Sequence, residues 1–213
     1  SFDNQGTLNK TGSEEYRISI NGFDNSGLVD VQEGTLEIWS AGTFDGDFQI
    51  AAGAELELTG FNKTFTAASS VGGLGDVQVL GGTHTFDTDL DLGDFDSQGG
   101  TSYINQNLTI DGGLTVAGGT VRLAQSFTEA GATTVNGSLI LGADNTWNER
   151  VGLTGSLQVE EGQTLRLNNG LDWDAGYVTG AGRLENAGTT HIGDVGLAVL
   201  NIAEFENSGL LDF

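Results

Sequence analysis

The segment GDFQIAAGAELEL, residues 46–58, decides the fold because it holds two alternating runs joined at a glycine. In the second run Leu56 and Leu58 share one side of an extended chain and two glutamates share the other, because side chains alternate along a strand. Gly53 stands at the junction, where a residue without a Cβ permits a positive φ and a tight change of direction. The segment therefore predicts a strand, a glycine corner and a second strand.

The same pattern occurs five times, each time with a second glycine seven positions after the first and another alternating run behind it. The copies are GLVDVQEG (27–34), GDFQIAAG (46–53), GDVQVLGG (75–82), GGLTVAGG (112–119) and GSLQVEEG (155–162). Several of the spacings between their starts lie near one or two multiples of about 20 residues. A coil of about 20 residues fits one rung of a parallel β-solenoid, whose rungs hydrogen-bond to each other about 4.8 Å apart.

We therefore predict an all-β fold, a single-stranded right-handed parallel β-solenoid (β-helix) with about 20 residues per rung. The right hand follows from the strong preference of parallel crossover connections. The lack of Pro fits an unbroken ladder, and no stretch has a helical period. The side chains expected to face inward and stack from rung to rung are Phe44 or Phe48, Leu56, Leu58, Val77, Val79, Leu114, Val116, Val121, Leu123, Leu139, Leu141, Leu157, Val159, Leu165 and Leu167.

Composition narrows the functional classes. The chain has 213 residues, 35 of them Gly, with no Cys, Met or Pro and a formal net charge of −23. Such a charge repels nucleic acids and anionic membrane surfaces, and the lack of Cys excludes disulfides, Cys-ligated metals and thiol catalysis. No apolar run approaches the roughly 20 residues that span a bilayer. Nothing marks a linker, so we expect one solenoid domain over residues 1–213.

The two ends of the chain resemble each other. Phe2-Asp-Asn4-Gln-Gly is echoed 21 residues later by Phe23-Asp-Asn25-Ser-Gly, and LENAG (184–188) is echoed 21 residues later by Phe205-Glu-Asn207-Ser-Gly. Residues 2–31 align with 184–213 without a gap, which suggests a super-repeat of 182 residues. We expect these matching rungs to stack end to end, either as tandem repeats of one long polypeptide or as subunits of a filament. The asparagines could occupy left-handed turns or form amide ladders inside the coil.

The repeated phrases also carry a resemblance. FDNQGTLNKTG, FDNSGLVDVQEGTLEI, VGGLGDVQVLGGTHTF and GGLTVAGGTVRL resemble the repetitive β-helical stalks of large bacterial surface proteins, the filamentous-haemagglutinin-like and autotransporter-passenger-like adhesins. The resemblance implies a secreted or cell-surface β-solenoid that serves as a stalk, spacer or adhesive surface. It implies a glycan or host-surface ligand as the partner of an adhesive surface, and it brings no catalytic residues and no cofactor.

One acidic stretch is a candidate calcium site. Asp89, Asp91, Asp94 and Asp96 alternate with apolar residues around a glycine. Calcium prefers several oxygen ligands at about 2.3–2.6 Å, and two carboxylates on one strand face could be joined by one beyond the corner. The alternative is an ordinary solvated outer face.

Catalytic patterns are sparse. Asp172-Trp173-Asp174 could serve a glycoside hydrolase, with paired carboxylates around a sugar-stacking ring. The same pattern also fits an ordinary strand, in which alternation places the two aspartates on the solvent-exposed side and Trp173 in the core. His84 and His191 lack a partner motif and are expected to point outward. The sequence thus favours a non-enzymatic, extracellular structural or adhesive solenoid, with a carbohydrate-active β-helix enzyme or a glycan- or calcium-binding module as alternatives.

Overall fold

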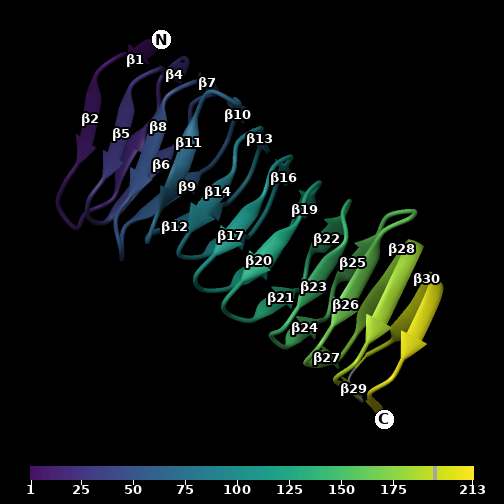
Figure 1. Cartoon of the computed structure of the whole chain (residues 1–213). Coiled ribbons are helices and arrows are strands. Elements are labelled where there is room, and N and C mark those ends of the chain that lie inside the picture. The colour runs from purple at the N-terminus through teal and green to yellow at the C-terminus, as the bar shows by residue number, and fades with distance from the viewer. Residues whose placement is uncertain (194–195) are drawn as a thin grey trace.

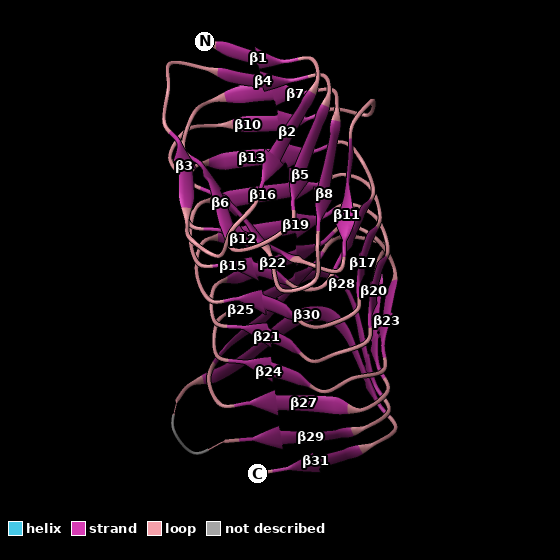
Figure 2. Cartoon of the chain, turned by 90° about the vertical axis from the view of Figure 1, so that its left-hand side faces the viewer, coloured by secondary structure: helices cyan, strands magenta, loops and turns pink. Residues whose placement is uncertain are grey.

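The computed structural model describes residues 1–193 and 196–213, which wind into a coil of short parallel strands with one terminus at each end (Figure 1). Each circuit of the coil, here called a rung, contributes strands to three faces. Strands on one face pair in parallel with those of the neighbouring rungs, so the sheets run along the axis while the chain runs around it (Figure 2).

The strands of sheet A follow one another along the first face. They are β1 (Phe2–Asn4), β4 (Phe23–Asn25), β7 (Gly42–Phe44), β10 (Lys63–Phe65), β13 (Thr83–Phe86), β16 (Thr101–Ile104), β19 (Thr120–Leu123), β22 (Ser138–Leu141), β25 (Ser156–Val159), β28 (Gly176–Asn186) and β30 (Ala198–Asn207). Sheet B forms the second face with β2 (Thr7–Lys10), β5 (Leu28–Val31), β8 (Asp47–Ile50), β11 (Ser70–Gly73), β14 (Leu90–Leu92), β17 (Leu108–Ile110) and β20 (Phe127–Glu129). Sheet C forms the third with β3 (Tyr16–Ile18), β6 (Thr35–Ile38), β9 (Glu55–Leu58), β12 (Asp76–Val79), β15 (Phe95–Ser97), β18 (Leu114–Val116), β21 (Thr133–Val135), β24 (Val151–Leu153), β27 (Gly170–Trp173), β29 (Thr189–Ile192) and β31 (Leu210–Asp212).

Two of the faces join near the C-terminal end. The 11-residue strand β28 pairs through its first part with β25 and through its last part with β26 (Thr164–Leu167). Strand β26 in turn pairs with β23 (Asn145–Trp147), so both strands belong to sheet A. The corner between the first two faces is therefore absent from the rungs of β28 and β30.

The register confirms the predicted solenoid. Residues stacked on neighbouring rungs are between 18 positions apart, as for Asp76 and Asp94, and 23 positions apart, as for Asp47 and Ser70. Identical residues often meet, for example Phe65 with both Phe44 and Phe86. The predicted length of about 20 residues per rung is correct, and loops at the corners absorb the variation.

The predicted core is also correct. Both Phe44 and Phe48 are buried, and so are all the other side chains that alternation placed inside. The N-terminal rungs add an aromatic stack, in which the ring centroids of Phe44 and Phe65 lie 4.8 Å apart and those of Phe65 and Phe86 lie 4.7 Å apart. Burial of apolar side chains along the whole axis is the main force that holds the rungs together.

Glycines shape the corners as expected, but the repeated unit does not mark one corner. The second glycine of all five units has a positive φ, for example 76° at Gly53 and 90° at Gly82. Gly53 turns sheet B into sheet C, Gly82 turns sheet C into sheet A, and Gly162 leads from β25 to β26. The unit is thus a general corner motif of the coil, and this explains why its spacing is irregular.

Corner glycines also permit close stacking of the rungs. A Cβ on Gly100 would lie 2.4 Å from the carbonyl oxygen of Gly82, and a Cβ on Gly119 would lie 2.3 Å from that of Gly100. Any larger residue would push neighbouring rungs apart. The part of the chain that the structure describes contains no helix, and hence none of the length and hydrophobicity that would cross a membrane.

Candidate functional site

The structure does not bring the four aspartates of the predicted calcium site together. Asp91 lies on β14 of sheet B, whereas Asp96 lies on β15 of sheet C, beyond a corner of the coil. Asp89 accepts hydrogen bonds from the backbone and side chain of Asn107, and Asp94 accepts one from the backbone of Gly113. Within residues 1–193 and 196–213, these four do not form a group of three or more carboxylates within reach of one ion.

The residues considered for a glycosidase site are not arranged for catalysis either. Trp173 is buried in the core, so its ring is not available for stacking on a sugar. Asp172 points outward and accepts two hydrogen bonds from Arg150. These bonds lower the pKa of Asp172, which keeps it ionised rather than ready to donate a proton.

The two histidines differ from each other. His191 points outward, as predicted, with Nδ1 3.3 Å from a carboxylate oxygen of Asp212. The prediction for His84 is wrong, because its side chain is fully buried under sheet A. His84 lies two residues before Phe86 on β13, and alternation places both side chains on the inward side of the strand.

His84 belongs to a buried polar column. Its neighbours in register are Lys63 on one rung and Ser102 on the next, and both are buried. The Lys63 Nζ donates to the carbonyl oxygens of Thr59 and Phe61, at 2.6 and 2.8 Å. Burial lowers the pKa of Lys63 to about 8, and burial together with Lys63 lowers the pKa of His84 to about 4.

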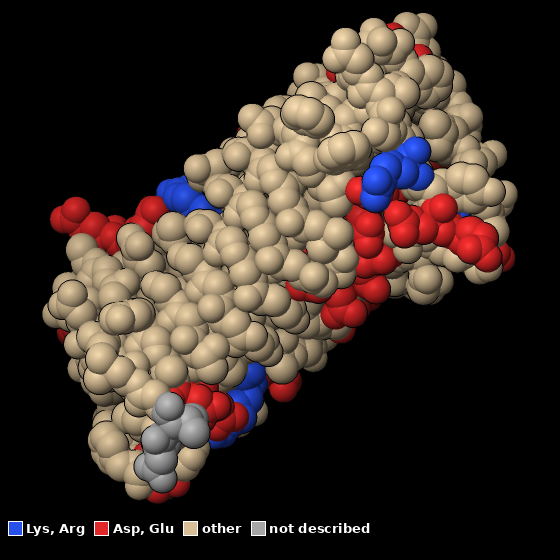
Figure 3. Space-filling model, turned by 180° about the vertical axis from the view of Figure 1, so that it is seen from behind, with Lys and Arg blue, Asp and Glu red and all other residues tan. Residues whose placement is uncertain are grey.

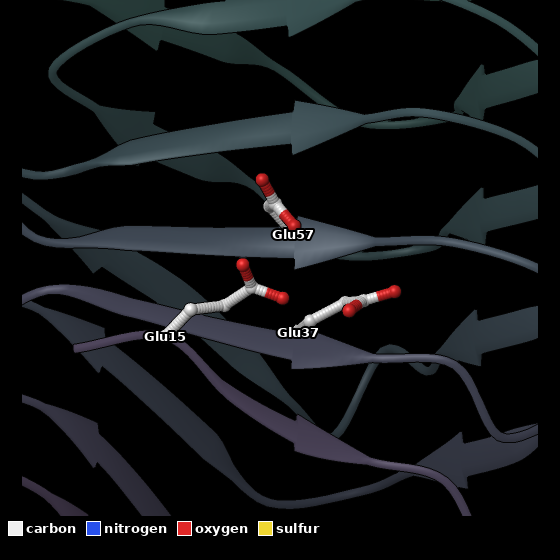
Figure 4. A group of neighbouring side chains, drawn as sticks. All are labelled: Glu15, Glu37 and Glu57. Atoms are coloured by element: carbon white, nitrogen blue, oxygen red, sulfur yellow. The ribbon is translucent and has the colours of Figure 1, made fainter.

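Three other carboxylates do gather, on the N-terminal part of sheet C. Glu15, Glu37 and Glu57 come from successive rungs, and each offers an oxygen within 4.8 Å of the others (Figure 4). Arg17 is ion-paired to Glu37 and lies 4.0 Å from Glu15. Burial would raise the pKa of Glu37, but the Thr59 hydroxyl and the Arg17 guanidinium outweigh it and hold that pKa below its usual range.

The acidic surface continues along sheet C. A hollow of about 300 Å³ is lined by Glu55, Asp76, Asp94 and Asp96. Figure 3 shows a group of acidic side chains beside a basic one toward the N-terminal end of the coil. Burial and neighbouring carboxylates raise the pKa values of Glu57 and Asp76, and burial raises that of Glu55. No sequence pattern marks this group, because its members come together only through the register between rungs.

The matching rungs at the two ends stack on their own neighbours. Phe2 and Phe23 lie in register with parallel rings 5.8 Å apart. Asn4 donates its side-chain amide to Asn25 at 2.7 Å. Asn186 donates to Asn207 in the same way at 2.7 Å, while Phe205 pairs in register with Leu184. Among the described residues no residue other than glycine has a positive φ, so the asparagines form ladders rather than left-handed turns.

The C-terminal end of the coil opens into an apolar hollow of about 280 Å³. It lies inside the last rungs, between Trp173, Leu184, Leu200, Phe205 and Phe213. Phe213 is 83% exposed there. In the described part of the chain, β30 pairs with β28 and β31 pairs with β29, and the hollow lies beside these strands.

Comparison with known proteins supports the resemblance seen in the sequence. The chain is 34% identical over 141 residues to the Adhesin BmaC autotransporter of Brucella suis biovar 1 (strain 1330). The match covers 63% of this chain but 4% of that adhesin. No protein-family model matches the chain, and no solved structure gives a significant match. The chain is therefore a β-solenoid with sequence similarity to an autotransporter adhesin.

Proposed function

We propose that the chain is a non-enzymatic, extracellular segment of a β-solenoid adhesin, serving as a stalk or as an adhesive surface. The observation that carries the proposal is the unbroken stack of rungs in a chain similar to part of an autotransporter adhesin. A long, stiff, in-register coil separates its two ends and exposes three long faces. This geometry suits reach and multiple surface contacts better than a closed active site.

The side chains on those faces support a non-enzymatic role. Asp172 is held as a carboxylate by Arg150, and the neighbouring Trp173 lies in the core. A glycosidase needs one carboxyl group that keeps its proton and a second that stays ionised across the same sugar. Asp172 is therefore placed as the ion-pair partner of Arg150, and Trp173 is placed as a core residue.

Two measurements test this role. Beads coated with the purified chain should bind to cultured epithelial cells or extracellular matrix more than beads coated with an unrelated acidic protein. The same preparation should release no reducing sugar from a panel of acidic and neutral polysaccharides. Turnover that disappears in the Asp172→Asn, Asp174→Asn double variant would contradict the proposal.

We further propose that this segment stacks end to end with a copy of itself or with a matching tandem repeat. The amide ladder supports a head-to-tail direction, because Asn186 donates to Asn207 and Asn4 donates to Asn25, always toward the C-terminal rung. A copy placed after Asn207 would continue that direction with its own Asn4. Asn4 lies at the end of β1 on the first face, whereas Asn207 stacks on Asn186, which stacks on Leu167 of β26. To place its Asn4 on Asn207, the added copy would have to be rotated about the axis by one face.

Variants at the exposed ends test the stacking. Phe213→Lys places a charge on the apolar end, and Phe2→Lys does so at the other end, where the ring is also partly exposed. Leu74→Lys is the matched control, because Leu74 is 65% exposed on a corner away from both ends. Sedimentation and electron microscopy should detect linear oligomers of the wild type and of the control but not of the end variants. Monodisperse wild-type monomers at high concentration would rule out assembly of separate subunits.

A further inference from the structure

Two exposed aromatic rings lie beside the carboxylates of sheet C. Trp39 is 42% exposed and Phe61 is 62% exposed, and their ring centroids lie 6.3 Å apart at the corner that follows β6 and β9. A Cβ on Gly60 would come within 1.9 Å of the Trp39 indole, so glycine at this corner lets the ring lie against the backbone. A pair of solvated aromatic rings on an acidic protein marks a contact surface.

Arg17 already occupies one position on this surface. Its guanidinium carbon lies 5.6 Å from the centre of the Trp39 ring, and the same guanidinium is ion-paired to Glu37. The cation is thus held between an aromatic face and a carboxylate, an arrangement that favours a flat guanidinium.

The next rung also carries a carboxylate and an exposed ring. Glu57 stacks in register on Glu37, and Phe61 lies three residues after the end of β9, beyond Gly60, whereas Trp39 directly follows β6. Among the residues that the structure describes, no Lys or Arg forms an ion pair with Glu57, Glu55 or Asp76. A bound cation stabilises carboxylates that face one another in a partly buried setting, because it offsets their mutual repulsion.

We propose that this surface, formed by Phe61, Glu57 and the hollow lined by Glu55, Asp76 and Asp94, binds an extended arginine-rich peptide segment of a partner protein. One arginine packs on the exposed ring of Phe61 and pairs with Glu57. From Glu55 the segment runs along the axis, because Asp76 and Asp94 follow Glu55 on successive rungs. Its charge is complementary to this face.

The probe is a fluorescently labelled oligoarginine peptide, with an oligolysine peptide of equal length for comparison. Binding is followed by calorimetry and by the emission of Trp39, since Trp147 and Trp173 are buried. Oligoarginine should bind more tightly than oligolysine, because a guanidinium both stacks on a ring and pairs with a carboxylate in two-point geometry. Glu57→Gln and Phe61→Ser should each weaken binding at least about fivefold.

Glu161→Gln is the matched control, because it removes the same charge from an exposed side chain on the corner after β25. It should change the affinity by less than about twofold at physiological ionic strength. Circular dichroism checks that each variant keeps its fold, and Phe61→Ser alters a side chain that is mostly in solvent. An equal loss in Glu161→Gln would mean that overall charge alone attracts the peptide, and would overturn the proposal. Displacement of the peptide by calcium, with the same response of Trp39 to calcium alone, would also overturn it in favour of a metal site.

Discussion

The N-terminal and C-terminal halves of the coil share one architecture but differ in the residues of one inward column and in the pairing of several surface carboxylates. In the inward column of sheet A, Lys63, His84 and Ser102 stack on successive rungs, and the same column continues with Val121, Leu139 and Leu157. On the outside, Glu55, Glu57 and Asp76 of the N-terminal half have no ion pair to Lys or Arg in the described chain, whereas Arg122 and Arg150 pair with Glu160 and Asp172 in the other half.

The difference separates what the fold needs from what it tolerates. The C-terminal half shows that this inward column can be built from apolar side chains alone. The N-terminal half keeps a buried amine, a buried imidazole and facing carboxylates, each of which costs free energy of folding. Such costs are expected where a surface serves recognition rather than stability.

The largest expected effect comes from giving the C-terminal half a buried charge without a partner. Leu139→Lys should lower the free energy of unfolding by about 4 kcal/mol or prevent folding, because the ammonium would enter a buried apolar column between Val121 and Leu157. Ile140→Lys, on the outward side of the same strand, is the control and should cost less than about 1 kcal/mol. Hydrogen exchange resolved by rung measures both effects, and equal losses in the two variants would contradict this view of the column.

Acidification should weaken the N-terminal half through His84. Its pKa falls from 6.5 to about 4 on folding, so its contribution to stability is complete above pH 6.5 and is lost as the pH falls toward 4. At about 1.4 kcal/mol per pH unit, the loss approaches about 3 kcal/mol across that window.

The variant His84→Leu isolates this effect. Protonation of Glu55, Glu57 and Asp76, whose pKa values are raised in the folded chain, stabilises the coil as the pH falls and does so equally in both proteins. The difference between urea unfolding curves of wild type and variant should therefore grow as the pH drops from 6.5 to 4. A constant difference would mean that His84 does not titrate in the folded state within this range.

The fold could be predicted from sequence because it depends on local rules. The alternating pattern predicted inward residues such as Leu56 and Val159, and the glycine at the end of each of the five units predicted a positive φ. The same rule would have placed His84 inside, since it shares the parity of Phe86 in the run Thr-His-Thr-Phe. The polarity of histidine favours an outward position, but the position of His84 in the strand places its side chain inside.

The candidate site could not be predicted, because it depends on register between rungs. Arg17 meets Glu37 across 20 residues and Thr59 meets Glu37 across 22, and corner loops set these offsets. The aspartates around Gly93 look close in the sequence, but the corner sends Asp91 and Asp96 to different sheets. Proximity in sequence is therefore misleading at this corner, where the chain passes from one sheet to the next.

Removal of the buried amine should bring the N-terminal half closer to the other half. Lys63→Met should stabilise the chain by about 1 kcal/mol at pH 7, because the cost of burying the ammonium exceeds the loss of its bonds to Thr59 and Phe61. The pKa of Lys63 falls from 10.5 to about 8 on folding, so wild type gains stability as the pH rises from 8 to 10.5. The variant should lack this gain, and identical pH profiles over that range would contradict the prediction.

The smallest effects should have opposite signs at the two ends of sheet C. Glu57→Gln should stabilise the chain by about 0.5 kcal/mol, because it removes a carboxylate that faces Glu15 and Glu37. Asp172→Asn should destabilise it by about 0.5 kcal/mol, because it breaks the paired hydrogen bonds from Arg150 at a partly exposed site.

Salt distinguishes these two effects from changes in packing. Added sodium chloride screens both the repulsion around Glu57 and the attraction at Asp172, so the two differences should shrink toward zero together. Both substitutions are nearly isosteric, which keeps the contacts of the side chains with the sheet unchanged. Thermal unfolding of the two variants and wild type at low and high salt measures the signs directly. Equal signs, or differences that persist at high salt, would mean that the two ends of sheet C do not differ in electrostatic compensation.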